Sequence, residues 1–422
     1  MTKETYRDAL LIERYEDIIF ELDSNLIVPA AGSRQKKDNH TFSIDNSGEL
    51  PPLDWYNARF NVDLNMQNLA GNANIDAADG IVNSSFSLIN NLLVKINGVT
   101  VYDCSDANQA TNIKNLLEYS QGYIKSQGTN ELFYLDTSRN KDDNNIGFTS
   151  RRALLANRNV NLNVEIPFNR YSFFEGLEDQ ILPNSKISIT VDFESDANLS
   201  WGRAVNTNRV MITKFQLIVP RIIFNTKGNE LYVSRYPKPR KWTYLREQIY
   251  TLNSTTQRSG NFRISTGVDK PRHVFVFFLN DAQIDNFEHN KFMYDTNNVG
   301  GDQQLESCYL EVGYGKKYPE TEYAPQTEPT RVFRDVLKYV NAVNEYDINT
   351  LLNRLNFASL FPFIYFDLTK QPIDIRNGLT KLVFKYSLTG VAGAAYSIYA
   401  LVLREQDIET KEMGKQLVLS SM

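Results

Sequence analysis

The sequence predicts an all-β protein made of two antiparallel β-sandwiches in tandem, with a few short surface helices. Three observations carry this prediction: segments in which apolar and polar residues alternate strictly, a high aromatic content, and a Pro-rich joint near the middle of the chain. Aromatic residues form 12% of the chain, and they are favoured in strands. The length of 422 residues suits two domains of roughly 200 residues each.

Strict alternation marks three half-buried strands. It is clearest at residues 160–168 (VNLNVEIPF) and recurs at 60–66 and 187–193. One face of each strand can pack on a second sheet while its Asn, Asp, Ser and Thr residues meet water, as in antiparallel sandwiches. Further strands are predicted at 92–96, 99–102, 210–224, 273–279, 308–312, 361–368, 382–388 and 396–403.

Signals for turns and helices are fewer. Asn97-Gly98 lies between two apolar runs and predicts a type I′ hairpin, which needs positive φ at both positions. Helices are predicted at 107–123 and 330–342. The second has Thr330 as its predicted N-cap. Its apolar residues share one face, so we expect it to lie as a surface helix on the edge of a sheet.

One segment divides the chain. Residues 234–242 (SRYPKPRKW) combine two prolines with basic residues, which is typical of a turn followed by an extended segment. The segment predicts a first sandwich with an N-terminal arm in residues 1–230, and a second sandwich with a C-terminal tail in residues 231–422. The long polar stretches 126–149 and 283–304 are predicted to be surface loops.

Motifs for catalysis or metal binding are missing from the sequence. It contains no phosphate loop, dinucleotide fingerprint, zinc motif or serine-hydrolase elbow. His273 is expected at a strand end and His289 in a polar loop, so neither predicts a metal site. Cys104 and Cys308 are too few for a disulfide framework or a zinc site, and they favour a reducing place of folding. The sequence therefore predicts no catalytic residue, no cofactor and no metal.

Two clusters leave alternatives open. Asp63, Glu165 and Asp192 could supply the carboxylate pair of a glycosidase, although their places on alternating strands favour solvated positions. A carbohydrate-binding or glycan-cleaving sandwich is therefore the alternative function. A basic cluster with interleaved aromatic residues could touch phosphate, but its position in the joint favours a structural linker. That cluster comprises Arg235, Lys238, Arg240, Lys241 and Arg246, with Tyr236, Trp242 and Tyr244.

The net charge and the N-terminal residues limit which partners and locations we expect. A net charge of −5 argues against direct packaging of nucleic acid, so no sequence-specific nucleic-acid binding is expected. Residues 1–14 are charged throughout, unlike a secretory signal. No stretch approaches the ~20 apolar residues that span a membrane. We therefore expect a chain without signal peptide or membrane insertion.

Four stretches between about residue 55 and residue 405 have a familiar order. They are 86–101 (FSLINNLLVKINGVTV) with 113–119 (IKNLLEY); 162–164 with 182–191 (LPNSKISITV); 270–280 (KPRHVFVFFLN) with 290–292 (NKF) and 310–319 (LEVGYGKKYP); and 363–369 (FIYFDLT) with 382–388 and 400–405 (ALVLRE). This order resembles the double jelly-roll major capsid proteins, and most closely the hexon-like proteins of Polinton/Maverick elements and virophages. Gly313-Tyr314-Gly315 departs from the family, in which an Asn-Gly turn is usual.

The resemblance implies a function in building a shell. Each jelly roll would be two packed sheets, three copies would form a pseudo-hexagonal homotrimer, and trimers would tile an icosahedral capsid. The chain would be made in the host cytoplasm and end in the virion. Its implied partners are neighbouring trimers, a single jelly-roll penton protein and minor capsid proteins. No residue would be catalytic. The segment before about Asn39 and residues 406–422 would lie at the base.

Overall fold

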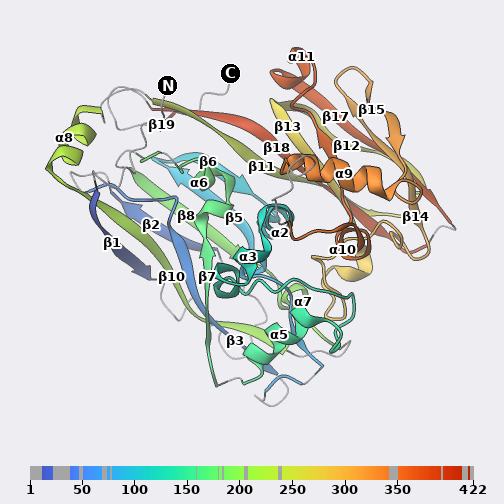
Figure 1. Cartoon of the computed structure of the whole chain (residues 1–422), viewed down its shortest axis with the longest axis horizontal. Helices are drawn as coiled ribbons and strands as arrows, with labels where there is room; N and C mark the ends of the chain where they lie inside the picture. The colour runs from blue at the N-terminus through green and yellow to red at the C-terminus, as the bar shows by residue number, and fades with distance from the viewer. Residues whose placement is uncertain are drawn as a thin grey trace.

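In a computed structural model, the chain forms two β-sandwiches that lie side by side along the long axis of the molecule (Figure 1). We call them sandwich 1 and sandwich 2 in chain order. The structure describes residues 12–21, 39–46, 51–68, 74–76, 78–157, 159–178, 180–182, 185–203, 208–235, 240–341, 350–390, 393–410 and 417–418.

Sandwich 1 consists of two antiparallel sheets, with strand orders β1-β10-β3-β7 and β2-β8-β5-β6. A short ribbon of β4 and β9 lies beside them. The bounds of these strands are β1 (Ile12–Glu21), β2 (His40–Asp45), β3 (Arg59–Asn68), β4 (Gly80–Ile81), β5 (Ile89–Ile96), β6 (Val99–Cys104), β7 (Leu162–Pro167), β8 (Lys186–Phe193), β9 (Ser200–Trp201) and β10 (Asn208–Phe224).

Sandwich 2 also has two antiparallel sheets, with strand orders β11-β18-β13-β16 and β12-β17-β14-β15. The short β19 adds to β18. The bounds are β11 (Arg240–Thr255), β12 (Ser259–Asp269), β13 (Pro271–Asn280), β14 (Gln304–Val312), β15 (Lys316–Tyr323), β16 (Ile364–Asp367), β17 (Leu379–Thr389), β18 (Tyr396–Thr410) and β19 (Leu417–Val418).

The two sandwiches share one topology. When the eight main strands of each are counted in chain order, without the short β4, β9 and β19, both have a sheet of order 1-8-3-6 and a sheet of order 2-7-4-5. Two packed sheets with these crossing connections are a jelly roll. The predicted fold class, two tandem antiparallel jelly-roll sandwiches with short helices, is confirmed.

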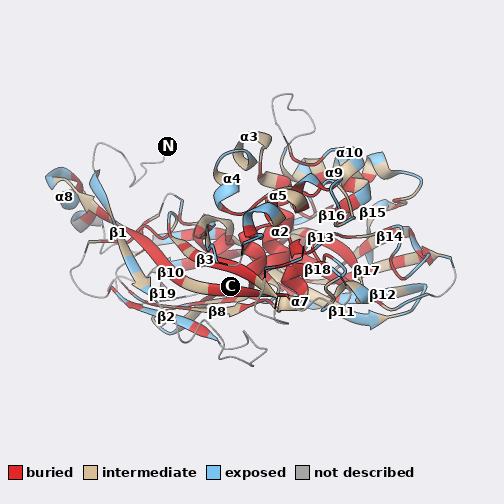
Figure 2. Cartoon of the chain, turned by 90° about the horizontal axis from the view of Figure 1, so that it is seen from below, coloured by how far each residue is buried: buried red, intermediate tan, exposed pale blue. Residues whose placement is uncertain are grey.

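Alternating side chains place one face of each strand in a core. In β3, Phe60, Val62 and Leu64 have no exposed surface, while Asn61 and Asp63 lie on the opposite face and keep some exposure. The ring of Phe60 stacks on Phe215 of β10, with centroids 4.7 Å apart. Because burying such a side chain contributes about 1.5–3 kcal/mol, the alternation fixes which face points inward. Buried residues run through both sandwiches without a break (Figure 2).

The predicted hairpin at Asn97-Gly98 is confirmed. Both residues have positive φ, 50° and 83°, and they join β5 to β6. The equivalent turn of sandwich 2 joins β14 to β15, and there Gly313 and Gly315 have φ of 63° and 97°. Both hairpin turns therefore need residues with positive φ, and the two sandwiches use different residues at these positions.

Short helices fill the connections. Two carry most of the contacts described below: α2 (Ala107–Glu118) and α9 (Pro329–Tyr339). The latter lies against the edge strand β16, as predicted. It begins at Pro329 with Glu328 as N-cap, so the prediction of Thr330 as N-cap was wrong. The others are α3 (Gln121–Ile124), α4 (Gln127–Asn130), α5 (Ile146–Leu155), α6 (Ser172–Glu175), α7 (Asp196–Leu199), α8 (Thr226–Arg235), α10 (Arg354–Leu360), α11 (Ile373–Arg376), η1 (Ser85–Leu88), η2 (Phe168–Arg170) and η3 (Asp281–Gln283).

The two stretches predicted as surface loops are partly core. Within 126–149, Phe133 and Phe148 are at most 1% exposed, and within 283–304, Phe292 and Tyr294 are at most 2% exposed. Single aromatic residues in a polar background anchor these segments. The prediction failed because composition averages over a segment, whereas burial is decided residue by residue.

Strands also occupy both chain ends. Residues 12–21, predicted as part of an N-terminal arm, form β1 and pair with β10. Residues 406–410, predicted as part of a tail, continue β18 beside β11. The remaining residues of these two segments lie outside the described ranges, apart from β19.

Candidate functional site

The outer face of the 1-8-3-6 sheet of sandwich 2 is buried. Phe275 pairs in register with both Leu401 and Tyr365, so these three side chains share one face. All three are at most 2% exposed. Phe278 lies on the opposite face and packs on Phe384 of the second sheet, with ring centroids 6.1 Å apart. Both faces of this sheet are therefore packed, one within sandwich 2 and one outside it.

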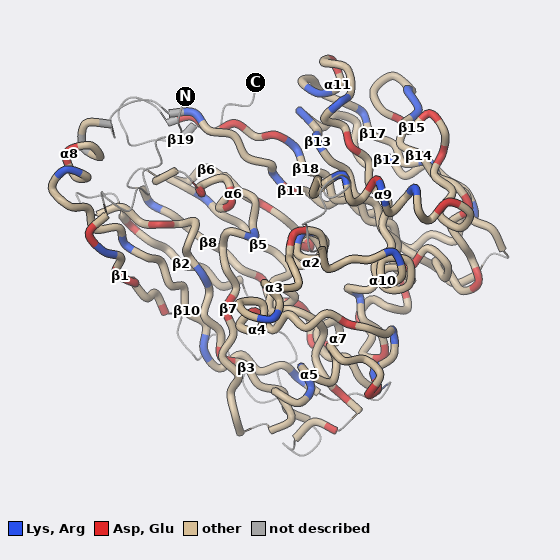
Figure 3. Tube along the Cα trace, in the orientation of Figure 1, with Lys and Arg blue, Asp and Glu red and all other residues tan. Residues whose placement is uncertain are grey.

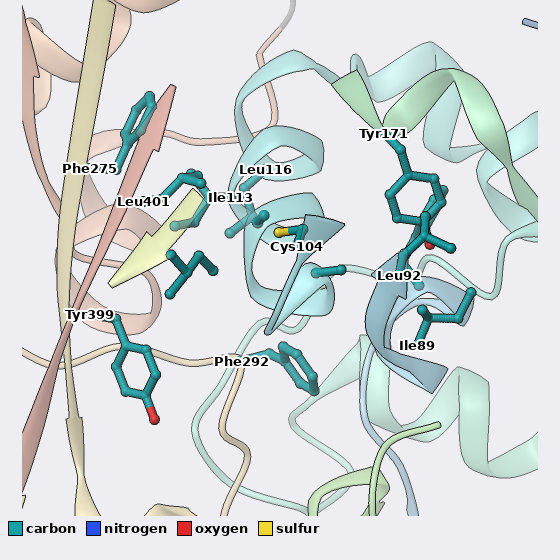
Figure 4. Packing of buried hydrophobic residues seen from close by; sticks show 14 of the residues in the cluster. Ile89, Leu92, Cys104, Ile113, Leu116, Tyr171, Phe275, Phe292, Tyr399 and Leu401 are labelled. Atoms are coloured by element: carbon teal, nitrogen blue, oxygen red, sulfur yellow. The ribbon is translucent and has the colours of Figure 1, made fainter. Parts of the chain in front are cut away.

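Helix α2 of sandwich 1 covers that outer face. Its residues Ile113 and Leu116 have no exposed surface, and they point toward Leu401 of β18 (Figure 4). On the other side of the helix, Ile89 and Leu92 of sandwich 1 belong to the same hydrophobic cluster. We call this contact between the sandwiches the seam. It joins the two cores into one.

A buried ion pair lies in the seam. The Lys114 ammonium of α2 lies 3.0 Å from a carboxylate oxygen of Glu247 on β11, and 2.7 Å from one of Glu175. Glu247 is 0% exposed and also accepts a hydrogen bond from the Tyr102 hydroxyl. Burial alone would lower the pKa of Lys114, but the two carboxylates outweigh it and the pKa is raised. Lys114 therefore stays charged, as a buried pair requires.

A second ion pair crosses the seam, and here sandwich 1 supplies the carboxylate and sandwich 2 the ammonium group. Glu194 of sandwich 1 accepts from the Lys291 ammonium of sandwich 2 at 2.5 Å. It also accepts from the amides of Asn108 and Asn198 at 2.8 and 2.9 Å. Burial raises the pKa of Glu194, yet Lys291 and these donors hold it below its usual value. The carboxylate is thus kept ionised at the joint.

A third polar contact ties α2 to α9. Glu118 lies 2.7 Å from the Arg170 guanidinium and 3.0 Å from the Tyr339 hydroxyl, which donates to it. Burial raises the pKa of Glu118, but Arg170 outweighs it and the pKa is lowered. Tyr339 in turn packs edge-on against His273 and Phe275. The seam is therefore apolar at its centre and charge-paired around it.

The equivalent outer face of sandwich 1 is different. On the β1-β10-β3-β7 sheet this face carries a hydrogen-bonded polar network, and we call it the open face. Arg59 lies 3.0 Å from Asp17 and 3.4 Å from Glu165. Two apolar side chains on the same face, Tyr15 and Ile19, are 47% and 53% exposed. Its other polar residues include Glu21, Asn61, Asp63, Asn163 and Gln216.

A basic edge lies at the far end of sandwich 2. It is formed by β15, α9 and the turn before α11, which carry Asp and Glu as well as Lys and Arg (Figure 3). Arg334, Lys338 and Lys370 surround a hollow of about 460 Å³ there, with Asp367 as the acidic residue of its lining. Among the described residues, no carboxylate lies within ion-pair distance of Arg334 or Lys370. We call this surface the basic edge.

Solved structures of virus proteins have the same architecture over almost the whole chain. A chain of the Sputnik virophage matches with a TM-score of 0.61 at 11% identity, covering 98% of this chain and 89% of that one. A chain of the PBCV-1 virus capsid matches at 0.55 and 10%, covering 97% of each. The mavirus major capsid protein matches at 0.52 and 13%, covering 98% and 91%.

The chain has the double jelly-roll fold of virus capsid proteins. The resemblance read from the sequence is thereby confirmed at the level of the fold. No protein-family model matches the sequence, and no curated protein sequence matches it.

The three suspected carboxylates lie on the two sheets of sandwich 1. Asp63 accepts from Asn163 at 2.5 Å and lies in the polar network of the open face. Glu165 pairs with Arg59 on the same face. Asp192 accepts from Asn91 on the other sheet of sandwich 1, at 3.0 Å. Each of the three is used in a local contact on a sheet face, and Asp192 is on a different sheet from the others.

The basic cluster of the joint is described only in part. Tyr236, Lys238 and the side chains of Arg235 and Arg240 lie outside the described residues. Lys241 pairs with Asp407 at 3.1 Å. The Tyr244 hydroxyl donates to the Val101 carbonyl of sandwich 1 at 2.5 Å, and Trp242 belongs to the main core. The described aromatic residues therefore act in packing the sandwiches together.

The histidines and cysteines are spread over the fold. His273 donates to or accepts from the Tyr365 hydroxyl at 2.8 Å, and burial lowers its pKa to about 4. His40 is buried beside Phe193. Cys104 and Cys308 are buried free thiols in different sandwiches. In the described part of the chain, no three His, Cys, Asp or Glu residues are arranged to hold a metal, and no helix has the length and apolarity to span a bilayer.

Sequence reasoning missed the polar residues of the seam. The sequence analysis assigned no role to Lys114, Glu194 or Glu247, and nothing in their local sequence separates them from exposed Lys or Glu. Lys291 lies in the segment 283–304, which was predicted to be a surface loop. Only pairing across the fold gives these residues their role.

Proposed function

We propose that the chain is a major capsid protein whose homotrimers, as pseudo-hexagonal tiles, assemble an icosahedral shell. One observation carries the proposal: two sandwiches of identical strand order are formed by the described residues between Ile12 and Thr410, and chains from virus capsids match this chain over 97–98% of its length. The chain would then function as a structural element of the virion, made in the host cytoplasm.

Several features are consistent with a structural function. Polar groups buried in the seam make contacts between the sandwiches, such as Lys114 with Glu247 and Glu194 with Lys291. These contacts join the two sandwiches into one building block. We therefore propose that no residue is catalytic and that no cofactor or metal takes part.

We also propose the division of the chain. The first jelly roll with its N-terminal arm would occupy residues 1–230, and the second with its C-terminal tail residues 231–422. The boundary would lie in α8, between the end of β10 and the start of β11. A single jelly-roll penton protein and minor capsid proteins are the proposed further partners. Neither sequence-specific nucleic-acid binding nor membrane insertion is part of the proposal.

The experiment is to purify the whole chain and measure its mass by light scattering, then image concentrated samples by electron microscopy. A trimer of three times 48.4 kDa, about 145 kDa, which assembles into shells or sheets of hexagonal tiles, would support the proposal. A stable monomer that binds oligosaccharides on a glycan array would contradict it and favour the carbohydrate-binding alternative.

A further inference from the structure

We propose that the Lys291 amine of sandwich 2 reacts with the side-chain amide of Asn108 in sandwich 1, which joins the two sandwiches by a covalent amide bond. Glu194 lies between the two groups and transfers the protons. The reaction happens once, on the chain itself, and turns over no substrate. The inference goes beyond the proposed function and does not depend on the trimer.

The three groups come from separate parts of the fold and are buried together. Lys291 lies in the connection between β13 and β14, Glu194 directly follows β8, and Asn108 is the second residue of α2. Their exposed fractions are 6%, 4% and 1%. Lys and Glu are seldom buried so deeply unless they are paired, and here the pair has a side-chain amide beside it.

One carboxylate oxygen of Glu194 holds both reacting groups. Its Oε2 accepts from Lys291 Nζ at 2.5 Å and from Asn108 Nδ2 at 2.8 Å. The Asn108 Cγ is one bond beyond Nδ2, so the amine and the amide carbon are held beside the same atom. Holding two reacting groups in one place removes much of the entropy loss that slows their reaction in solution.

The amide oxygen of Asn108 has a donor of its own. The backbone N–H of Gln109 donates to Asn108 Oδ1 at 2.8 Å, and also to the Asp106 carbonyl at 2.9 Å. Negative charge develops on Oδ1 when an amine adds to the amide carbon, and a backbone N–H already in place stabilises it. The first turn of a helix favours negative charge as well.

Helix α2 also fixes the backbone at Lys291. The Gln109 side-chain amide donates to the Lys291 carbonyl at 3.0 Å, and the Asn112 amide donates to the Phe292 carbonyl at 3.2 Å. Figure 4 shows Phe292 close to this helix. The helix that carries Asn108 therefore holds the backbone from which the amine reaches it.

The reaction balances without another reactant. Glu194 takes one proton from the Lys291 ammonium, and the electron pair freed on Nζ forms the bond to Asn108 Cγ. The Cγ–Nδ2 bond then breaks, and its electrons leave with Nδ2. Of the three ammonium protons, one stays on the new amide and two reach Nδ2 through Glu194, so Nδ2 leaves as ammonium. A hollow of about 650 Å³ that borders Glu194 and Lys291 gives it a path to water.

Burial favours the first proton transfer. It disfavours the charged forms of both the ammonium and the carboxylate, so the neutral pair lies closer in energy to the ion pair than it does in water. The ion pair of Lys291 and Glu194 is the state before the reaction. The other buried pair lacks an amide: among the described residues, Glu247 accepts from Lys114 and Tyr102 but from no Asn or Gln side chain.

A second amide, that of Asn198, also binds Glu194 but is placed differently. It donates to the other oxygen, Oε1, at 2.9 Å. Asp285 holds its carboxamide at both ends, because the Asp285 N–H donates to Oδ1 at 2.7 Å and the Asp285 carboxylate accepts from Nδ2 at 3.1 Å. Asn108 is therefore the assigned partner of Lys291.

A time course after synthesis tests the proposal. The whole chain is made by cell-free translation, sampled from the first minutes to several days, denatured, and measured by intact mass spectrometry. Its mass should fall by one ammonia as the link forms. Because Asn97-Gly98 can also lose ammonia by cyclising on its own backbone, a tryptic digest must identify the bond. Residues 96–114 should be joined to residues 273–316, without cleavage at Lys291.

Three variants test the roles of the groups, with circular dichroism to check folding. Lys291→Arg keeps a cation at Glu194 but replaces the amine by an always-charged guanidinium, so no joined peptide should form. Glu194→Gln should slow the link at least about a hundredfold. The control is Lys141→Arg, at another ion pair between the sandwiches, and it should link as fast as the original chain.

The original chain decides the outcome even if a variant does not fold. If its residues 96–114 are never found joined to 273–316, the inference is overturned. A link from Lys291 to residues 187–203, which contain Asn198, would contradict the assignment to Asn108. Equal rates for Glu194→Gln and the original chain would contradict the role of Glu194. The link is read from monomer and trimer alike, so its absence leaves the proposed function untouched.

Discussion

The two sandwiches share a strand order but differ in the outer face of the 1-8-3-6 sheet. In sandwich 2 this face is apolar, with Phe275 and Leu401 buried under α2. In sandwich 1 it is polar, with Arg59 and Asp17 paired and Ile19 about half exposed. The face that is covered by α2 within the chain can be largely apolar, because it is withdrawn from water on folding. The face that stays in water in the single chain carries mostly polar and charged side chains.

The largest expected effect comes from shortening a side chain on the outer face of the 1-8-3-6 sheet of sandwich 2, which is buried in the seam. Phe275→Ala should lower the free energy of unfolding by about 3–5 kcal/mol, since it leaves a cavity in the seam. Ile19→Ala, at the equivalent face of sandwich 1, should change it by no more than about 0.5 kcal/mol. Urea unfolding of both variants at low protein concentration measures the difference. If the two variants lose the same free energy of unfolding, the two sheet faces do not differ in how much they contribute to stability.

The next effect concerns the charge pairs of the two faces. Glu247→Leu should cost about 3–5 kcal/mol, because it leaves the Lys114 ammonium buried without its main partner. Adding Lys114→Met should regain much of that loss. Glu165→Leu on the open face should cost at most about 1 kcal/mol, since its partner Arg59 is partly solvated. A double variant no more stable than Glu247→Leu alone would show that the pair does not act as a unit.

The seam should also make stability depend on pH. Glu118 and Glu194 have lowered pKa values, so they stabilise the fold above their unfolded pKa of about 4.3. That contribution is lost as the pH falls through their folded values. His273, with its pKa near 4, binds its proton more readily when unfolded, so stability should already decline below pH ~6.5.

Two variants separate these contributions. Glu194→Gln should flatten the decline below pH ~4.3, and His273→Phe should flatten the part between pH ~6.5 and 4. Thermal unfolding midpoints followed over this pH range measure both. If the midpoints of the two variants and of the original chain fall in parallel with pH, groups other than Glu194 and His273 cause the loss of stability in acid.

The smallest expected effect compares the equivalent hairpins of the two sandwiches. Gly98→Ala and Gly315→Ala should each cost about 1 kcal/mol, because both glycines have positive φ and no heavy atom lies near a Cβ built there. The cost is therefore one of backbone conformation alone. Chemical unfolding of the two variants would show whether the hairpins are equivalent, and a clear difference between them would argue against it.

All central strands of the four main sheets could be predicted from sequence, but only three of their eight edge strands, β6, β7 and β16. The alternating segments 60–66 and 187–193 form strands that have neighbours on both sides and pack on one face. Apart from the two-residue strands β4, β9 and β19, the strands to which no prediction was assigned are β1, β2, β11, β12 and β15, and all five lie at the edge of a sheet. Edge strands are more solvated, so polar residues interrupt their pattern; β15 reads KKYPETEY.

The seam could be predicted even less. The apolar run around Phe275 indicates a buried strand, but it does not tell whether one face meets its own sandwich or the other. Lys114 and Glu247 are 133 positions apart, and only the tertiary fold brings them together. Periodicity predicted two β-sandwiches, but not their strand order. The order of the motifs, which resembles that of double jelly-roll capsid proteins, predicted that both sandwiches are jelly rolls.

A reconstruction of the purified trimer by electron cryomicroscopy, at a resolution that separates the strands, tests the central claim most directly. We predict a pseudo-hexagonal ring of six sandwiches, in which each chain supplies two sandwiches joined by the seam. A particle whose sandwiches form no such ring would contradict it.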